Sequence, residues 1–409
     1  MPTTRAEPAE GTRRRPRDRK AQIARASAEA FSALGYHAVS MDAIAAKVGI
    51  SAPALYRHYA SKYDLFRDAV LGLGQQLVEC TAFADAAAAD VNPAEMLGRV
   101  VDGLIDVAVL NRESGGLYRW HARYLRAEDQ SALADQLRTV NRRIQRPLLA
   151  IRPSLTSPER WMLSSGLLSV IGSVVDHRVR LPADDIRVLL AGPTSALPAA
   201  ELPKPDDVVA RPAAWRVFAS DAGGYEALLH ASMVLFNERG YPETSMAQIA
   251  STAGIPVSGI YRYFSGKYEI LATGLCRAAD RVMGYLSAVG NEISDPRQML
   301  TRLIEGYVAT SFANPELAAI YYTERVNLVR ADQELLRDVQ RSTINSWVRL
   351  LTSARPALTA TQARFLVHAA MALVVDLGRL VHYEDLADSA YPQACVRKLM
   401  DITMFERSD

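Results

Sequence analysis

Residues 31–66 read FSALGYHAVSMDAIAAKVGISAPALYRHYASKYDLF, and this stretch decides the fold class. Its apolar spacing predicts two short helices, over 41–47 and 52–59. A serine precedes each helix, where its side chain can cap the first turn. Gly49 supplies the tight turn between them. Two short helices joined by such a turn predict a helix-turn-helix, whose second helix can enter the major groove of DNA.

The same pattern occurs a second time. Residues 236–271 read FNERGYPETSMAQIASTAGIPVSGIYRYFSGKYEIL, and when 21–65 is placed over 226–270, 15 of the 45 aligned positions are identical. A further echo pairs RPSLT at Arg152–Thr156 with RPALT at Arg355–Thr359. Similarity at a fixed spacing marks duplicated units. The chain is therefore predicted to contain two tandem units of about 200 residues each.

Composition bounds the remaining possibilities. The 409 residues, 49% hydrophobic and 22% charged, suit two or three packed domains. Helical periodicity dominates, so an all-α protein is expected. Three dispersed cysteines argue against a disulfide framework or a zinc site. The longest uncharged stretch, 161–175, is too short to cross a bilayer, and no apolar leader follows the start. We therefore expect a cytoplasmic protein with no membrane partner.

A proline-rich stretch separates the two copies. Residues 191–212 contain five prolines and no helical period, which predicts an extended linker. The expected organisation is a basic disordered arm (1–19), a first helix-turn-helix head (20–67), a first helical regulatory domain (68–190), the linker (191–222), a second head (223–272) and a second regulatory domain (273–409).

The two heads differ in charge. Residues 1–67 carry twelve cations and six acids, a net charge of +6, whereas residues 206–272 carry five cations and seven acids, a net charge of −2. Because phosphate neutralisation dominates affinity for DNA, we expect the first head to bind better than the second.

Residues of the second helix and its surroundings are the candidate DNA contacts. Base contacts are predicted for Ala52, Ala54 and Arg57, and phosphate contacts for Lys47, Tyr56, His58 and Lys62, with Arg13, Arg14, Arg15 and Arg17 in the arm and Ser258, Tyr261, Arg262 and Lys267 in the second head. Other readings stay open for some of them. Tyr56 and Tyr59 could pack the core, His58 could be a solvated surface residue, and the arm could be a solvated tail.

The motif F-x3-GY-x3-SM-x2-IA-x3-GIS-x4-Y-x2-Y-x2-K, from Phe31 to Lys62, resembles the DNA-binding head of the tetracycline-repressor (TetR) family, and Phe236–Lys267 is similar to it. The resemblance implies a bacterial one-component transcriptional regulator, commonly a repressor. Each unit would pair a three-helix head with a helical ligand domain and would dimerise through its last two long helices. Two fused units could form a pseudo-twofold pair within one chain, so a homodimer and an internal pair both stay open.

Two further sets of residues are singled out. Small hydrophobic or amphiphilic effectors could bind the aromatic and basic clusters Tyr118, Trp120, His121, Tyr124, Tyr321, Tyr322 and Arg325. The apolar helical stretches 161–175 and 365–375 carry small residues and should pack against each other or against another chain. Asp176, His177 and Asp376, at the ends of these stretches, are expected to be structural polar groups.

The sequence motifs also bear on two other classes of protein, an enzyme and a protein-interaction module. An enzyme is disfavoured because no phosphate loop, nucleophile elbow or metal-binding helix motif occurs and no cofactor or metal site is indicated. A protein-interaction or dimerisation module with degenerate heads would suit the acidic second head but not the arginine-rich arm.

Overall fold

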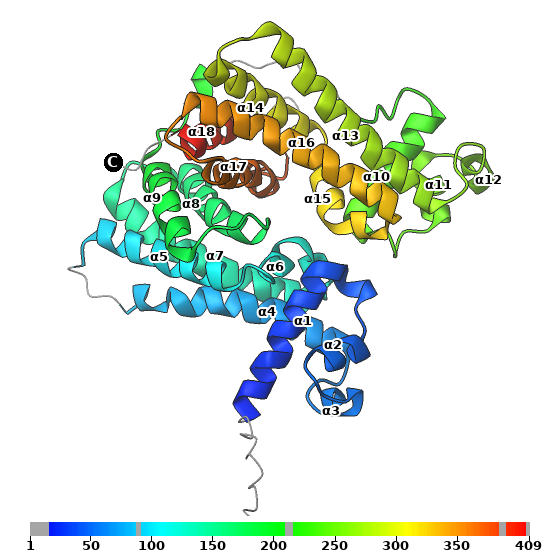
Figure 1. Ribbon diagram of the computed structural model, residues 1–409, viewed down its shortest axis with the longest axis horizontal. Helices are drawn as coiled ribbons and strands as arrows, with labels where there is room; N and C mark the ends of the chain where they lie inside the picture. Colours follow the sequence, from blue (N-terminus) through cyan, green and yellow to red (C-terminus); the bar gives the residue numbers. More distant parts are fainter. Residues whose placement is uncertain (1–15, 87–90, 209–215, 384–389, 406–409) are drawn as a thin grey trace, which may run out of the picture.

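The computed structural model describes residues 16–86, 91–208, 216–383 and 390–405, and within these ranges every regular element is a helix (Figure 1). The first unit contains α1 (Pro16–Ala38), α2 (Met41–Lys47), α3 (Ala52–Tyr56), α4 (Lys62–Cys80), α5 (Pro93–Leu110), α6 (Gly116–Trp120), α7 (Ala127–Ile151), α8 (Ser157–Gly172) and α9 (Ala183–Ala199). The second contains α10 (Gly224–Arg239), α11 (Met246–Ala253), α12 (Val257–Ile260), α13 (Lys267–Glu292), α14 (Pro296–Ala313), α15 (Pro315–Glu324), α16 (Arg330–Ala354), α17 (Ala360–Leu380) and α18 (Ala390–Phe405). The all-α prediction is confirmed. None of the described helices has both the length and the apolar character that crossing a membrane requires.

Each unit begins with a three-helix head that has its own hydrophobic core. Ser40 Oγ accepts a hydrogen bond from the N–H of Ala43, and Ser51 Oγ accepts one from Ala54, so both predicted caps are present. Gly49 has φ +67°, a conformation that residues with a Cβ rarely adopt. Caps and turn together fix the angle between α2 and α3.

The two regulatory parts share one continuous core. Helix α8 packs against α17 and α9 packs against α18, in the left-hand part of Figure 1. Gly166 of α8 lies at the contact with α17, where an added Cβ would be 3.6 Å from Leu373 Cδ2. The predicted pairing of the apolar stretches 161–175 and 365–375 is therefore confirmed, and it occurs within one chain.

The second helix of the first motif is shorter than predicted. Helix α3 ends at Tyr56, not at residue 59. Tyr59 is only 4% exposed, because the chain turns its ring into the core of the head. Ser61 then caps α4 by accepting from the N–H of Asp64, which leaves no room for a longer α3.

The predicted arm and linker are both shorter than expected. Residues 16–19 belong to α1, which begins at Pro16. Proline lacks a backbone N–H, and at the first helical position that N–H would have no helical partner. Residues 1–15 lie outside the described ranges. Residues 191–199 belong to α9 although Pro193 and Pro198 each remove a helical hydrogen bond. Both prolines are buried with Leu197, so packing against the shared core outweighs the lost bonds.

Candidate nucleic-acid interface and adjoining cavity

Helix α3 presents a solvent-facing surface made of predicted contact residues. Tyr56 is 53% exposed, Arg57 and His58 are exposed, and Ala52 and Ala54 are half-buried. Leu55 between them is fully buried and anchors the helix to the core. The structure therefore brings five predicted contacts together on the outside of the first head.

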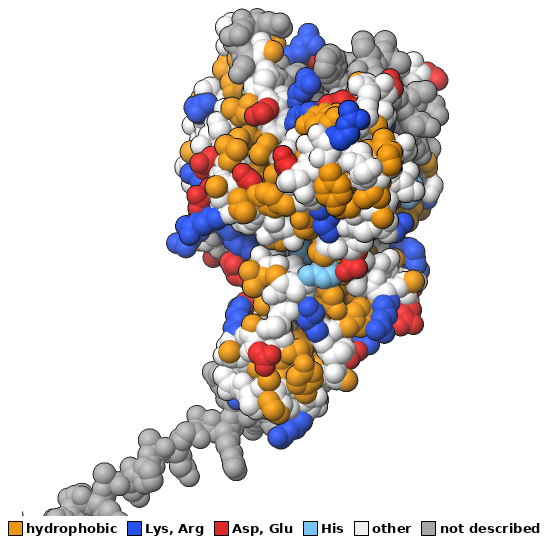
Figure 2. All heavy atoms as spheres, turned by 90° about the vertical axis from the view of Figure 1, so that its right-hand side faces the viewer, with side chains coloured by type: hydrophobic (Ala, Val, Ile, Leu, Met, Phe, Trp, Pro, Cys, Tyr) orange, Lys and Arg blue, Asp and Glu red, His pale blue; other side chains and the backbone are white. Residues whose placement is uncertain are grey.

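The second head offers a matching but less basic surface. Ser258, Tyr261 and Arg262 are exposed on and just after α12, and the aromatic ring of Tyr263 is exposed beside them. In Figure 1 both heads lie on the right-hand side of the molecule, and Figure 2 views that side, where a narrow waist separates them. The heads approach each other at the waist, where His37 Nε2 lies 3.8 Å from Glu243 Oε1.

Two predicted lysine contacts already have partners in the protein. Lys47 Nζ lies 2.9 Å from Glu29 Oε2 at a largely exposed site. Lys62 Nζ donates to three carbonyl oxygens, of Tyr36, His37 and Val39, at 3.0, 3.3 and 3.1 Å. Because an ammonium has three donors, Lys62 fixes the end of α1 instead of offering a free charge to phosphate. Lys267 makes the equivalent contacts in the second head.

Replacing Lys62 by methionine should lower the free energy of unfolding by about 1.5–3 kcal/mol, because carbonyl groups at the end of α1 lose a charged donor. Urea unfolding followed by circular dichroism measures the change. Lys47→Met is the matched control and should change stability by less than about 1 kcal/mol, since its ion pair is exposed. If the Lys62→Met variant kept full stability but lost affinity for DNA, the result would contradict this structural role and support the phosphate contact predicted from the sequence.

The arginines predicted in the arm are only partly within the described structure. Arg13, Arg14 and Arg15 lie outside the described residues, and Arg17 lies in the first turn of α1.

A tyrosine that sequence reasoning overlooked joins each head to its regulatory domain. The Tyr63 hydroxyl donates to Asp129 Oδ2 at 2.5 Å and accepts from the N–H of Arg126 at 2.7 Å. Tyr268 and Asp332 make the same connection in the second unit. The signal was available, because both tyrosines and both aspartates are identical between the copies.

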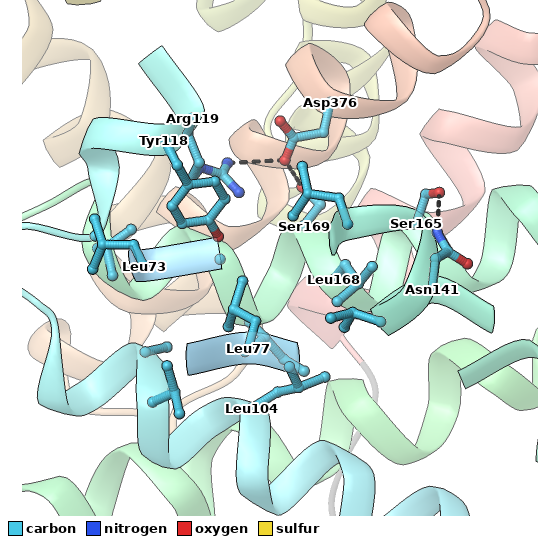
Figure 3. Close-up of a pocket in the computed structure, with 18 of the residues that line it drawn as sticks. Leu73, Leu77, Leu104, Tyr118, Arg119, Asn141, Ser165, Leu168, Ser169 and Asp376 are labelled. Carbon is cyan, nitrogen blue, oxygen red and sulfur yellow. Dashed lines mark hydrogen bonds and ion pairs between the residues drawn. The ribbon is translucent and has the colours of Figure 1, made fainter. Parts of the chain in front are cut away.

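A cavity of about 670 Å³ opens beside α6 in the first unit (Figure 3). Leucines line most of it, among them Leu73, Leu77, Leu104 and Leu168. Of the predicted effector contacts, Tyr118 lines this cavity. The volume falls within the range of roughly 300–1,000 Å³ that small-molecule sites occupy.

The other predicted effector residues contact the protein itself. The rings of Trp120 and Tyr322 stack at 4.1 Å across the boundary between the units. His121 is buried, and its burial together with Arg123 lowers its pKa to about 4. Tyr321 bonds to Gln340, and Arg325 lies 5.0 Å from the centre of the Tyr321 ring.

A buried ionic network lies at one end of the cavity. Arg119 Nη2 is 2.9 Å from both Asp176 Oδ2 and Asp376 Oδ2, and the Ser169 hydroxyl donates to the same Asp376 oxygen at 2.6 Å. Burial lowers the pKa of Arg119, but the two carboxylates together raise the pKa by more than burial lowers it. The net shift of the Arg119 pKa is therefore upward. Arg119 was missed because Asp376 is 257 positions away in sequence. The expectation that Asp176 and Asp376 are structural polar groups agrees with these contacts.

The segment 116–124 also reaches both heads. Tyr124 stacks on Tyr36 of the first head, with ring centres 5.8 Å apart. Arg123 donates to the Asn237 carbonyl at the end of α10 at 3.2 Å and forms an ion pair with Glu324, whose side chain is 1% exposed. One short stretch therefore touches the cavity, the first head and the second head.

Comparisons with known proteins agree with this architecture. Residues 23–69 and 228–273 match the model of bacterial regulatory proteins of the tetR family. The HTH-type transcriptional activator FasR of Mycolicibacterium smegmatis is 48% identical over 63 residues, which are 14% of this chain and 29% of that protein. The HTH-type transcriptional regulator HbdR of Aromatoleum is 28% identical over 109 residues, 27% of this chain and 47% of that protein. The structure of the ketosteroid transcriptional regulator KstR2 of Mycobacterium tuberculosis covers 46% of this chain and 97% of that one, with 20% identity and a TM-score of 0.40.

The matched regions contain the two heads described above. Residues 23–69 and 228–273 are therefore each similar to bacterial regulatory proteins of the tetR family, and the similarity occurs once in each of the two units. The chain spans less than half the length of each of the two curated relatives named above.

Proposed function

We propose that this protein is a transcriptional regulator that reads an operator chiefly through α3 of its first head, with a weaker contribution from α12. The observation that carries the proposal is the exposed set Tyr56, Arg57 and His58 at the carboxyl end of the capped helix α3, in a head with a surplus of cations. A helix of this kind fits the major groove, where its side chains meet base edges.

The position of the second head supports a bipartite site. Figure 1 shows the second head at the right-hand edge of the molecule and the first head below it, at the lower end. Two half-sites about one helical turn apart, roughly 34–36 Å, suit heads that dock on one face of a duplex. Because α12 lies in an acidic head, the two half-sites need not be equivalent in sequence or in affinity.

A small hydrophobic or amphiphilic effector is the second part of the proposal. The apolar cavity adjoins α6, and the segment 116–124 links that helix to Tyr36 of the first head and to the end of α10 in the second. A ligand that shifts this segment would bias both heads at once, because each contacts the same few residues.

Arg57→Ala should weaken operator binding by about 10–100-fold and relax base preference at one position, the loss expected for a bidentate base contact. Arg262→Ala, the equivalent change in the second head, is the matched control and should weaken binding less. The measurement is fluorescence anisotropy of the full chain on duplexes selected from genomic DNA, at fixed salt.

Equal losses for the two variants would contradict the dominance of the first head. A wild-type chain that binds no duplex at any salt concentration would overturn the regulator proposal and favour a protein-interaction module with degenerate heads.

A further inference from the structure

The cavity of the first unit is completed by the second unit. Most of its walls come from α4, α5, α6, α7 and α8, but Asp376, Arg379 and Leu380 of α17 close one side. Figure 3 shows Tyr118 and Arg119 next to Asp376 and Ser169 at this end, with leucine side chains along the remainder. Residues from both copies therefore determine what can bind.

Charges at this end already balance. Arg119 contributes from α6, Asp176 follows the short 3-10 turn Ser173–Val175, and Asp376 and Arg379 contribute from α17. Arg379 is held against the face of Trp120, 4.8 Å from the ring centre. Two cations face two carboxylates, so no surplus positive charge is present to receive an anion.

Arg119 nevertheless retains hydrogen-bonding capacity. Its side chain is 8% exposed, its Nη2 contacts both carboxylates, and its Nε has no hydrogen-bond partner. A buried donor without a partner destabilises the protein, and a ligand oxygen that accepts a hydrogen bond from it would remove that cost. The neighbouring Tyr118 side chain also lines this end of the cavity and carries a hydroxyl group.

Three other polar side chains of the lining, those of Asn111, Asn141 and Arg138, have partners already. Asn111 Nδ2 donates to Gln76 Oε1 at 2.8 Å, and Asn141 Nδ2 donates to Ser165 Oγ at 3.2 Å. Arg138 is exposed and paired with Asp135. A polar ligand atom would therefore be stabilised most at the Arg119 end of the cavity, where a hydrogen-bond donor has no partner.

We infer that this composite cavity binds an uncharged, mainly apolar molecule with one oxygen acceptor, which Arg119 and Tyr118 recognise, and that Asp376 of the second unit excludes the corresponding carboxylate. A ligand carboxylate would bring a third negative charge beside Asp176 and Asp376, and burying an unpaired charge is strongly unfavourable. The inference rests on the effector site of the proposed function and specifies its ligand class.

The test compares two probes of equal chain length, 2-dodecanone and dodecanoate. Binding to the full chain without DNA is measured by titration calorimetry, so the result does not depend on whether the heads bind an operator. The ketone should bind at least about tenfold more tightly than the carboxylate, since like charges placed together in an interface raise the free energy by several kcal/mol.

Asp376→Asn removes the excluding charge while keeping the shape of the side chain, and it should shift the ratio of the two affinities towards dodecanoate by at least about tenfold. Asp176→Asn removes a charge from the same network and should shift the ratio in the same direction if Asp376→Asn does not fold. Asp106→Asn, whose ion pair with Arg187 is exposed, should leave the ratio unchanged.

Three results would overturn the inference: equal or tighter binding of dodecanoate by the wild-type chain, an unchanged ratio in both network variants, or no binding of either probe. Tight ketone binding that leaves operator affinity unaltered would uphold the ligand class and contradict only the effector role.

Discussion

Arg119→Met is expected to lower the free energy of unfolding by about 3–5 kcal/mol, the loss typical of breaking a buried ion pair by removing one partner. Arg119 is 8% exposed and Asp176 is 7% exposed, so solvent screens the remaining charges poorly. Without the guanidinium, two carboxylates from different units face each other across the shared core. Chemical unfolding of the full chain in urea, followed by circular dichroism, measures the effect.

Arg187→Met is the control for this change. Arg187 forms ion pairs with Asp106 and Asp184 at an exposed site, so its loss should leave the unfolding curve nearly unchanged. Adding Asp176→Asn and Asp376→Asn to Arg119→Met should restore most of the lost stability, because the uncompensated charges are then absent. If the Arg119→Met and Arg187→Met variants were equally stable, the result would contradict a stabilising role for the ion pairs of Arg119 with Asp176 and Asp376.

Deleting residues 1–15 is expected to lower operator affinity by about two to three orders of magnitude near 0.1 M salt and to flatten its salt dependence. The segment carries Arg5, Arg13, Arg14 and Arg15, and each phosphate contact contributes about 0.9 to the slope of log K against log salt. Since α1 begins at Pro16, the deletion leaves the first head intact. Anisotropy titrations at several salt concentrations measure both quantities.

A charge-only control separates the arm's cations from its length. Changing Arg13, Arg14 and Arg15 together to glutamine should reproduce most of the flattening. The loss should be similar for specific and unrelated duplexes, because phosphate contacts do not read sequence. An unchanged slope after deletion would rule out a role for the arm in binding.

Local signals in the sequence were sufficient for the heads and for the pairing helices. Caps at Ser40 and Ser51 and the turn at Gly49 depend on neighbouring residues, and the apolar run in α8 implies burial whatever its partner. These features follow from short-range chemistry, which is why their positions could be predicted.

Features that depend on distant partners could not be predicted. The three carbonyl groups that hold Lys62 lie 23–26 positions away, and Asp376 lies still farther from Arg119. Prolines in 191–199 predicted an extended linker, because proline strongly disfavours the interior of a helix. The segment is nevertheless helical, since Pro193 and Pro198 pack into the core. Of the predicted effector residues, Tyr118 lines the cavity, whereas Trp120 and Tyr322 stack on each other across the boundary between the units. An aromatic cluster in the sequence does not distinguish these roles.

The helices α8, α9, α17 and α18 pack together within a single polypeptide. Covalent attachment replaces a bimolecular encounter by an intramolecular one, so the local concentration of each half around the other is set by the tether. This internal pair is consequently insensitive to dilution. Under the proposed function, a cell holding very few copies would still present two DNA-binding heads at once. The sequence of each unit can also change independently of the other. The two heads can therefore differ, and a DNA site that they share need not be a palindrome.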